Sequence, residues 1–472
     1  MSTANPKSII DVQEYGNPFE KLDEGIAFLM RLAKEKGYEA QITAGYVFSG
    51  TTRYAVNQVT QPTEFGEISF SLKLAAGKSV GSGSTTMVNE TGLTELFKQV
   101  ENIVQGAPEI PFFQGLPDPR PGTPKNLGSD DWTVEERAET VIQAINAAEE
   151  VQENVIVSGT ASTSINYQRI VNTDGIDVET STNGHYFKVN CIVESDTDKS
   201  HRGYGQEEIH FRTNRPNIEE MAVEAAKTAK DTLKLIDLPA KEYEVVLGHQ
   251  AVSDLFLFAQ FSLEPVGFHE TNSYASDRIG DQIFDEKINV EDRPLDPSNA
   301  NVVRAFDGEG LPTSNVQVFE KGVLKMIPYD SFNAARFLGD KNAATGHAFT
   351  FFGQTTGMFA SFVLEGGNKP YRGLVEDIEN GLWVKNFWYN RFTKRREGGL
   401  TGLTRNGLYH VENGEIQGAV RNLRYTESFV KAFGPDNVIS LSSDRRMYQL
   451  NTCPAAHLKA FNFSSVAHTT KQ

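Results

Sequence analysis

The chain has 472 residues, which is too long for a single hydrophobic core and predicts two or three domains. Its hydrophobic content of 39%, with 10% aromatic residues, is typical of a folded globular protein and argues against a largely disordered chain. The 45 Lys and Arg residues against 62 Asp and Glu residues give a net charge of −17, which disfavours general binding to nucleic acid or anionic lipid.

The N-terminal stretch and the cysteine content both indicate a cytoplasmic protein. The first residues, MSTANPKSIIDVQEYG, lack the basic start and apolar core of a secretory signal. No apolar run reaches the roughly 18 residues that a membrane helix needs. Two cysteines, Cys191 and Cys453, fit a reducing compartment better than a disulfide framework.

The first part of the chain reads as a helix, several antiparallel strands and a second helix. Apolar residues recur at helical spacing over residues 18–36, and strand-like runs follow at 39–48, 52–59 and 67–77. A second helix is predicted over residues 90–104. Six prolines between positions 108 and 124 then predict a linker, or a connection that follows the surface.

A second unit of the same plan follows. The sequence Thr133-Val134-Glu135-Glu136 forms a capping box and predicts a helix that runs to about residue 151. Strands are predicted at 153–167, 175–182 and 185–195, with tight turns at Asp174-Gly175 and Asn183-Gly184. A further helix is predicted over residues 218–236.

The pattern changes near residue 240. Residues 242–248 read as a buried strand and residues 248–261 as an apolar helix, after which hairpins dominate, with turns at Lys321-Gly322 and Asn413-Gly414. We therefore predict an α+β fold with two helix–antiparallel-sheet–helix units followed by a β-rich C-terminal domain. The expected limits are 1–112 for the N-terminal domain, 113–132 for the proline-rich linker, 133–238 for the central domain and 239–472 for the C-terminal domain.

The stretch GHQAVSDLFLF, residues 248–258, resembles a zinc-hydrolase helix that has lost its chemistry. A hydrolytic zinc site needs three or four ligands and a base for the bound water. His249 and Asp254 could serve as ligands, but Gln250 stands where the basic Glu is needed. We interpret His249 as a polar residue near the start of the helix.

Other chemical motifs in the chain are incomplete. His269-Glu270 has no second histidine one turn later, and Cys453 with His457 has no matching second pair. Residues 76–79 end like a phosphate-binding loop, but its first glycine position is Leu72. We therefore predict no catalytic residue, no metal ligand and no cofactor in this chain.

A basic run beside an aromatic stretch is the one local exception to the acidic composition. Arg391, Arg395 and Arg396 follow Trp388 closely. Such a run is either a solvated loop or a site for peptide carboxylates or an acidic partner, because guanidinium groups bind carboxylates with two hydrogen bonds. These four residues are the candidate peptide or partner groove.

Four segments in the same order resemble the TldD/PmbA family, once described as modulators of DNA gyrase and now associated with peptide processing. They are RYAVNQVTQ at 53–61, SYASDRIGDQIFDEKINVEDRP at 273–294, FDGEGLPTSNVQVFEKGVLKMIPYDSFNAARFLG at 306–339 and GLYHVENGEIQGAVRNL at 407–423. The resemblance implies two kinds of member. TldD-type chains hold a catalytic metal with a His-Glu-x-x-x-His helix and a later Cys, whereas PmbA/TldE-type chains lack these ligands and act as the partner subunit.

Counting back from Arg278, the resemblance places the metal helix near residues 256–261, where FLFAQF offers no ligand. The family's glycine-rich Cys segment is also absent, and Cys453 is expected to be a small buried residue at the start of a strand. The resemblance thus implies a PmbA/TldE-like, zinc-free subunit that forms a heterodimer with a TldD-like chain, or a homodimer, and acts on unfolded or precursor peptides. Two alternatives stay open: an autonomous metallopeptidase that uses His249, Asp254 or His269, and a binding modulator of a partner protein such as a topoisomerase.

Overall fold

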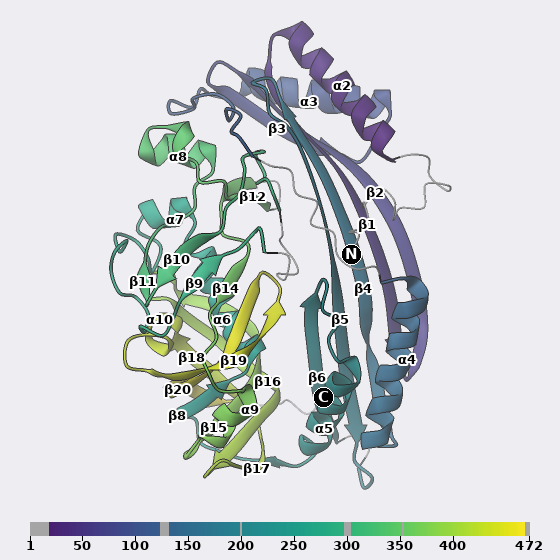
Figure 1. The fold of residues 1–472 in the computed structure, drawn as a ribbon, viewed down its shortest axis with the longest axis vertical. Helices are drawn as coiled ribbons and strands as arrows, with labels where there is room; N and C mark the ends of the chain where they lie inside the picture. The colour runs from purple at the N-terminus through teal and green to yellow at the C-terminus, as the bar shows by residue number, and fades with distance from the viewer. Residues whose placement is uncertain (1–17, 123–131, 199–200, 297–303, 352–353, 468–472) are drawn as a thin grey trace.

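The computed structural model describes residues 18–122, 132–198, 201–296, 304–351 and 354–467. Two large sheets dominate these residues, one of six strands and one of twelve. Figure 1 shows the long strands of the first sheet curving along one side of the hairpin-rich C-terminal region. The α+β class and the β-rich C-terminal region predicted from the sequence are confirmed.

The first sheet is built from both of the predicted helix–strand–helix units. The first unit consists of α2 Pro18–Lys36, β1 Glu39–Ala55, β2 Gln58–Ala76, β3 Ser79–Thr85 and α3 Glu90–Gly106. The second consists of α4 Val134–Val151, β4 Val155–Asn172, β5 Asp177–Glu194, β6 Arg202–Phe211 and α5 Ile218–Asp231. The strand order is β3-β2-β1-β4-β5-β6.

The two units meet through an antiparallel pairing of β1 with β4, in which Tyr46 lies opposite Tyr167. Helices α2 and α3 pack mainly on β1, β2 and β3, while α4 and α5 pack mainly on β4, β5 and β6, and each pair of helices covers one apolar cluster. The predicted capping box starts α4, with Thr133 accepting from the Glu136 amide. Because the units share one continuous sheet, the domain limits drawn from the sequence remain a prediction.

Three local predictions in this part of the chain are wrong. The strand predicted over residues 52–59 contains the turn between β1 and β2, where Val56 and Asn57 have positive φ angles. Asn183-Gly184 does not form a turn but lies inside β5, where Asn183 pairs with Ile165 of β4. The long neighbouring strand supplies hydrogen bonds on both sides of the dipeptide, and this tertiary pairing overrides its local turn preference. Helix α5 ends at Asp231 because Leu235 and Ile236 form β7, which pairs with the C-terminal sheet. The predicted turn at Asp174-Gly175 is confirmed, with Gly175 at φ 109°.

The proline-rich stretch follows the surface of the C-terminal region, as the second of the two sequence interpretations expects. The Lys341 ammonium donates to the Leu116 carbonyl at 2.6 Å, and Arg120 donates to the Ala344 carbonyl at 2.7 Å. These contacts fix the stretch after α3 against the turn that follows α8 (Ser331–Leu338). Residues 123–131 of the predicted linker lie outside the described residues.

The C-terminal region carries most of the strands and several short helices. Its helices are α6 His249–Phe261, α7 Pro265–His269, α8, α9 Tyr371–Glu376 and α10 Phe429–Ala432, with 3-10 turns η1 Lys341–Ala343 and η2 Arg395–Glu397. Its strands are β8 Glu242–Leu247, β9 Val290–Asp292, β10 Val316–Glu320, β11 Val323–Leu324, β12 Ala348–Phe351, β13 Gln354–Gly357, β14 Phe362–Leu364, β15 Asn380–Lys394, β16 Gly399–Glu412, β17 Glu415–Val420, β18 Leu423–Ser428, β19 Val438–Tyr448 and β20 Asn451–Val466.

The largest apolar cluster lies in this region and joins it to the long sheet. Ile170 of β4 and Ile176 belong to the same buried cluster as the core of the C-terminal region. The predicted hairpin turns are confirmed by positive φ angles at Lys321-Gly322 and Asn413-Gly414. Residues 265–269 form the short helix α7, with the Glu264 side chain capping its first amides.

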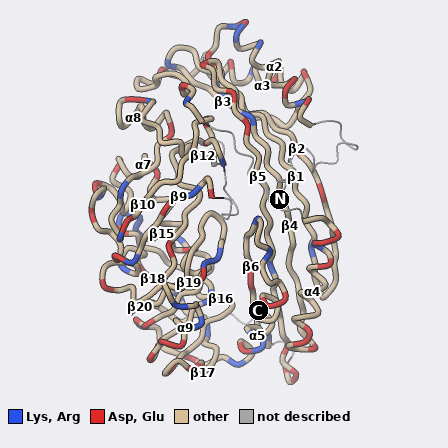
Figure 2. The backbone as a smooth tube through the Cα atoms, in the orientation of Figure 1, with Lys and Arg blue, Asp and Glu red and all other residues tan. Residues whose placement is uncertain are grey.

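Basic and acidic residues are interspersed along the backbone of the long sheet and of the C-terminal region (Figure 2). Among the described residues, no helix is long and apolar enough to cross a membrane.

Candidate functional site

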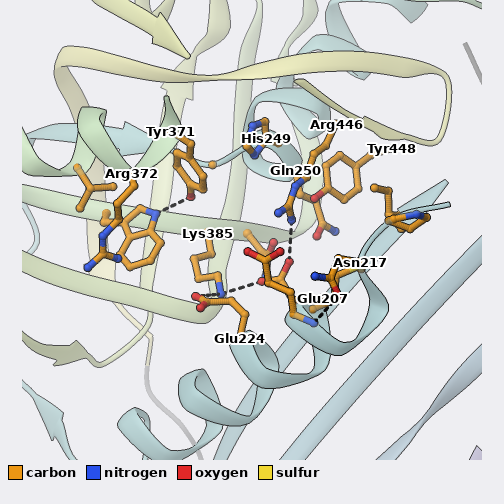
Figure 3. A pocket seen from close by; sticks show the side chains of 18 residues that line it. Glu207, Asn217, Glu224, His249, Gln250, Tyr371, Arg372, Lys385, Arg446 and Tyr448 are labelled. Atoms are coloured by element: carbon orange, nitrogen blue, oxygen red, sulfur yellow. Dashed lines mark hydrogen bonds and ion pairs between the residues drawn. The ribbon is translucent and has the colours of Figure 1, made fainter. Parts of the chain in front are cut away.

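A cleft of about 280 Å³ lies between the central helix–strand unit and the C-terminal region. Its walls come from β6 and α5 on one side and from α6, α9, β15 and β19 on the other (Figure 3). The lining includes Glu207, Asn217, Glu220, Glu224, Gly248, His249, Gln250, Tyr371, Arg372, Trp383, Lys385, Asn386, Arg446 and Tyr448. The site therefore forms only when segments distant in the sequence fold together.

Lys385 lies at the centre of the cleft and binds two carboxylates of the opposite wall (Figure 3). Its Nζ is 2.7 Å from Glu207 Oε1 and 3.0 Å from Glu224 Oε1, and it donates to Thr228 Oγ1 at 3.0 Å. Burial by itself lowers the pKa of Lys385, but the two carboxylates outweigh it and raise the pKa above its usual range. Arg446 adds a second cation, 3.3 Å from Glu207 Oε2.

His249 is the first residue of α6, as the sequence interpretation expects, and it is buried in the cleft wall. Its Nε2 lies 3.0 Å from Asp444 Oδ2, and the same carboxylate accepts from the Tyr371 amide at 2.8 Å. The hydrogen bond with His249 lowers the pKa of Asp444 to about 2. His249 thus has a structural partner that fixes the start of α6 to α9 and β19.

The other residues of the zinc-like stretch also have partners. Gln250 Nε2 donates to Glu208 Oε1 at 2.9 Å and so links α6 to β6. Burial raises the pKa of Asp254 well above its usual range, and the nearby Glu208 raises it further. A carboxyl group held in this way favours its neutral form, which is a poor metal ligand.

The donor set of the cleft does not fit a catalytic zinc ion. Within the residues that the structure describes, no three His, Cys, Asp or Glu side chains gather closely enough to hold a metal. The centre of the cleft holds the Lys385 ammonium, which would repel a divalent cation. Residues 256–261, where the resemblance places the family's metal helix, form the second half of α6, and Phe256 there is buried in the apolar core.

The predicted groove residues lie at the far end of β15 and in η2, and none of them lines the cleft. Trp388 is 48% exposed, with the Arg405 guanidinium 4.3 Å from its ring centre. Arg391 stacks on the exposed ring of Tyr389, and Arg395 lies over Phe392. Arg396 is exposed in η2 beside Arg395.

Sequence reasoning missed the charged centre of the cleft. Lys385 stands within the mostly apolar strand segment GLWVKNFW. A lysine in such a segment indicates a buried ion pair, but the neighbouring sequence does not identify the carboxylate that forms it. Glu224 is 161 residues away in the sequence. Cys453, by contrast, is fully buried near the start of β20, as predicted.

The fold is of the two-sheet α+β class, and in this chain the start of α6, the buried Lys385 and two acidic side chains meet in a cleft between the two parts. The profile of the PmbA/TldA metallopeptidase central domain matches residues 128–233, and that of the PmbA/TldA metallopeptidase C-terminal domain matches residues 240–465. The chain belongs to the PmbA/TldD family.

Two curated relatives match part of the chain. An uncharacterized protein of Methanocaldococcus jannaschii is 32% identical over 200 residues, which cover 41% of this chain and 44% of that protein. A metalloprotease PmbA homolog of Buchnera aphidicola is 20% identical over 312 residues, which cover 63% of this chain and 66% of that protein. Each match therefore spans less than two thirds of the relative's length.

Solved structures share the fold over nearly the whole chain. TldE from Thermococcus kodakarensis superposes with a TM-score of 0.83 at 17% identity, covering 94% of this chain and 100% of that chain. A protein from Thermotoga maritima described as a modulator of DNA gyrase gives a TM-score of 0.81 at 21% identity, again covering 94% of this chain and 100% of that chain. At these identities the likeness establishes the fold alone.

Proposed function

We propose that this chain is a PmbA/TldE-like subunit that binds no catalytic metal of its own. It assembles with a zinc-bearing TldD-like chain into a cytoplasmic peptidase that acts on unfolded or precursor peptides. The observation that carries the proposal is the composition of the cleft at the start of α6. There Lys385 is paired with both Glu207 and Glu224, Arg446 with Glu207, and His249 with Asp444.

The argument from this composition is electrostatic. A catalytic zinc needs three ligands with free lone pairs and an open fourth position for water. His249 is the only histidine among the cleft-lining residues, and Gln250, next to it, is already bonded to Glu208 and carries no basic group. A chain of this family that lacks zinc ligands in its cleft can contribute to peptide hydrolysis as the partner of a metal-bearing chain.

The surface formed by Trp388, Arg391, Arg395 and Arg396 is the proposed contact for the partner or for an acidic part of the peptide. Its support is the exposure of these side chains on a chain whose net charge is −17. Exposed aromatic rings covered by guanidinium groups are typical of strong contact points in protein interfaces. The same surface could pair two copies of this chain when the partner is absent.

The test is co-expression of this chain with a TldD-like chain that carries the His-Glu-x-x-x-His helix. We expect a stable heterodimer in which zinc is present at one ion per pair, and hydrolysis of an unfolded peptide only by the pair. The matched control is a pair in which the TldD-like chain has lost its motif glutamate, which should assemble without hydrolysing peptide. Stoichiometric zinc in this chain alone, together with peptide hydrolysis by it alone, would overturn the proposal.

A further inference from the structure

A β-bulge in β15 turns two aromatic side chains toward solvent. Trp388 pairs with Leu403 of β16 and Arg391 pairs with Thr401, so two residues of β15 stand opposite a single residue of β16. The first bulge residue, Tyr389, has a φ angle of 60°, which is unfavourable for a bulky side chain. Trp388 and Tyr389 are 48% and 58% exposed, and their ring centres lie 5.2 Å apart. Backbone strain that presents an exposed ring, with no burial of that ring in return, points to a binding role.

Buried contacts fix the shape of this bulge. The second bulge residue, Asn390, accepts a hydrogen bond at its Oδ1 from the Tyr425 hydroxyl at 2.7 Å, and Tyr425 is fully buried. Gly402 lies opposite the bulge, where a Cβ atom would collide with the same Asn390 oxygen. The two rings are therefore presented by a backbone that the core of the C-terminal region holds in place.

Each exposed ring is covered by a guanidinium group. Arg391 Cζ lies 4.1 Å from the centre of the Tyr389 ring, and Arg405 Cζ lies 4.3 Å from the centre of the Trp388 ring. Stacking on a ring fixes the plane of a guanidinium group and leaves donors at its edge free for a ligand. Because a guanidinium group already lies on each ring, a nucleic-acid base has less ring surface on which to stack. A carboxylate is the ligand that the free edge donors fit best.

The pairing of β16 with β18 extends this surface. Directly opposed residues of paired strands share one face of the sheet. Two such rows cross β15, β16 and β18, namely Trp388, Leu403, Arg424 and Arg391, Thr401, Thr426. Neither row contains an acidic residue. Among the described residues, no carboxylate forms an ion pair with the exposed Arg391, Arg405 or Arg424. We call these three arginines, with Trp388 and Tyr389, the arginine–aromatic face.

We propose that the arginine–aromatic face binds an acidic stretch of an extended peptide. Carboxylates of the peptide accept hydrogen bonds from Arg391, Arg405 and Arg424, and its neighbouring groups pack on the exposed edges of Trp388 and Tyr389. Charge complementarity selects this occupant, because the face gathers cations that have no carboxylate of their own. A second copy of the chain fits less well, since two chains of net charge −17 repel each other on approach.

The inference rests on the proposed function, in which unfolded peptide is the substrate. It adds the class of peptide that this chain recognises, and it assigns the face to the peptide instead of to the partner subunit.

The experiment uses the purified full chain without any partner and follows binding by fluorescence anisotropy. One labelled peptide carries several Glu residues in a Gly-Ser background, with both ends blocked, and a second carries Gln at the same positions. A labelled single-stranded oligothymidine of similar length is the third probe. We expect the Glu peptide to bind about ten-fold tighter than the Gln peptide at low salt, and to lose most of this preference at high salt, where exposed charges are screened.

The double variant Arg391→Gln with Arg405→Gln should weaken binding of the Glu peptide by about ten-fold. The matched control, Arg31→Gln with Arg202→Gln, removes the same charge from exposed arginines that pair with Glu35 and Glu194. Arg31 also lies over a ring, with its Cζ 5.4 Å from the centre of Phe28. The control should bind the Glu peptide as the original chain does.

Tyr389→Gly guards against a loss of binding that is caused by misfolding. Glycine adopts a φ angle of 60° without strain, so this variant should keep the melting temperature of the original chain while it binds the Glu peptide more weakly.

Three results would overturn the inference. They are equal binding of the Glu and Gln peptides, unchanged binding of the Glu peptide by the Arg391 and Arg405 double variant, and tighter binding of the oligothymidine than of the Glu peptide. If the double variant loses only its assembly with a TldD-like chain, the face is a subunit contact and the inference is likewise wrong.

The outcome separates from that of the proposed function. If the zinc-bearing pair hydrolyses peptide while this chain shows no preference for the Glu peptide, the assignment of the face is wrong and the subunit role stands. If this chain binds the Glu peptide through Arg391 and Arg405 but forms no pair with a TldD-like chain, the subunit role is wrong and the assignment stands.

Discussion

Replacing Lys385 with methionine tests whether the ion pairs of the cleft hold the central unit against the C-terminal region. The substitution keeps most of the side-chain volume and removes the ammonium that lies 2.7 Å from Glu207 and 3.0 Å from Glu224. Glu207 is 8% exposed and would retain only Arg446, at 3.3 Å, as a charged partner. The variant therefore removes one of the two cations that compensate this buried carboxylate.

The size of the effect follows from burial. The attraction between Lys385 and Glu207 is about 6 kcal/mol at an effective dielectric of ~20, but the cost of removing both ions from water offsets part of it. Removing one partner of a buried pair typically lowers the free energy of unfolding by about 3–5 kcal/mol. Glu224 adds little to this figure because its side chain is 42% exposed.

The assay is urea denaturation followed by tryptophan fluorescence, since Lys385 Nζ lies 5.8 Å from the Trp383 ring centre. Lys325→Met is the matched control, because its pair with Glu320 has the same 2.7 Å distance but side chains that are 40% and 58% exposed. It should cost less than about 1 kcal/mol. The double variant Lys385→Met with Glu207→Gln should recover at least half of the loss. A Lys385→Met variant as stable as the Lys325→Met control would refute the reasoning.

Three further substitutions test other parts of the structure. The Gln250→Glu variant should contain no zinc when its metal content is measured after purification, and stoichiometric zinc would contradict the site geometry. The same variant should lower the free energy of unfolding by about 1–3 kcal/mol, because the new carboxylate faces that of Glu208. Burial raises the pKa of Glu309 to about 7, so the folded state holds this proton more tightly than the unfolded state, whose pKa is about 4.3. Stability should therefore rise as the pH falls from above about 7 toward about 4.3. In thermal melts, Glu309→Gln should make the melting temperature depend less on pH over this range. The same pH dependence in the variant as in the original chain would contradict the prediction. Arg137→Met removes the guanidinium that donates to the Trp132 carbonyl and to Glu64, each at 2.6 Å. The free energy of unfolding measured in urea should fall by about 1.5–3 kcal/mol. A loss below about 0.5 kcal/mol, which is the size expected for an ordinary surface substitution, would contradict this prediction.

Local signals in the sequence predicted many of the elements correctly. Helix α4 begins at the Thr133 capping box because its side-chain hydrogen bonds are made within four residues. The Asn413-Gly414 turn is fixed by the ease with which these residues take positive φ angles. In each case the stabilising partners lie within a few residues, so a short window of sequence contains the whole cause.

Other local signals were overridden because their partners lie far along the chain. Asn183-Gly184 carries a turn preference, yet the full pairing of β5 with β4 keeps the chain extended through it. The two helix–strand units read as separate, yet the pairing of β1 with β4 joins them into one sheet. Strand pairing is decided by the sum of many cross-strand contacts, and no single dipeptide reports that sum.

The sequence by itself determined the α+β class, the succession of helices and hairpins and the absence of a basic group at Gln250, since each depends on residue identity or on neighbours within a turn. Only the tertiary structure decided what His249 and Lys385 do. Their partners Asp444 and Glu207 come from other segments, and burial in the cleft between those segments sets the charge balance. A low-dielectric cavity gives these contacts their strength, and that cavity exists only after the two sheets have packed together.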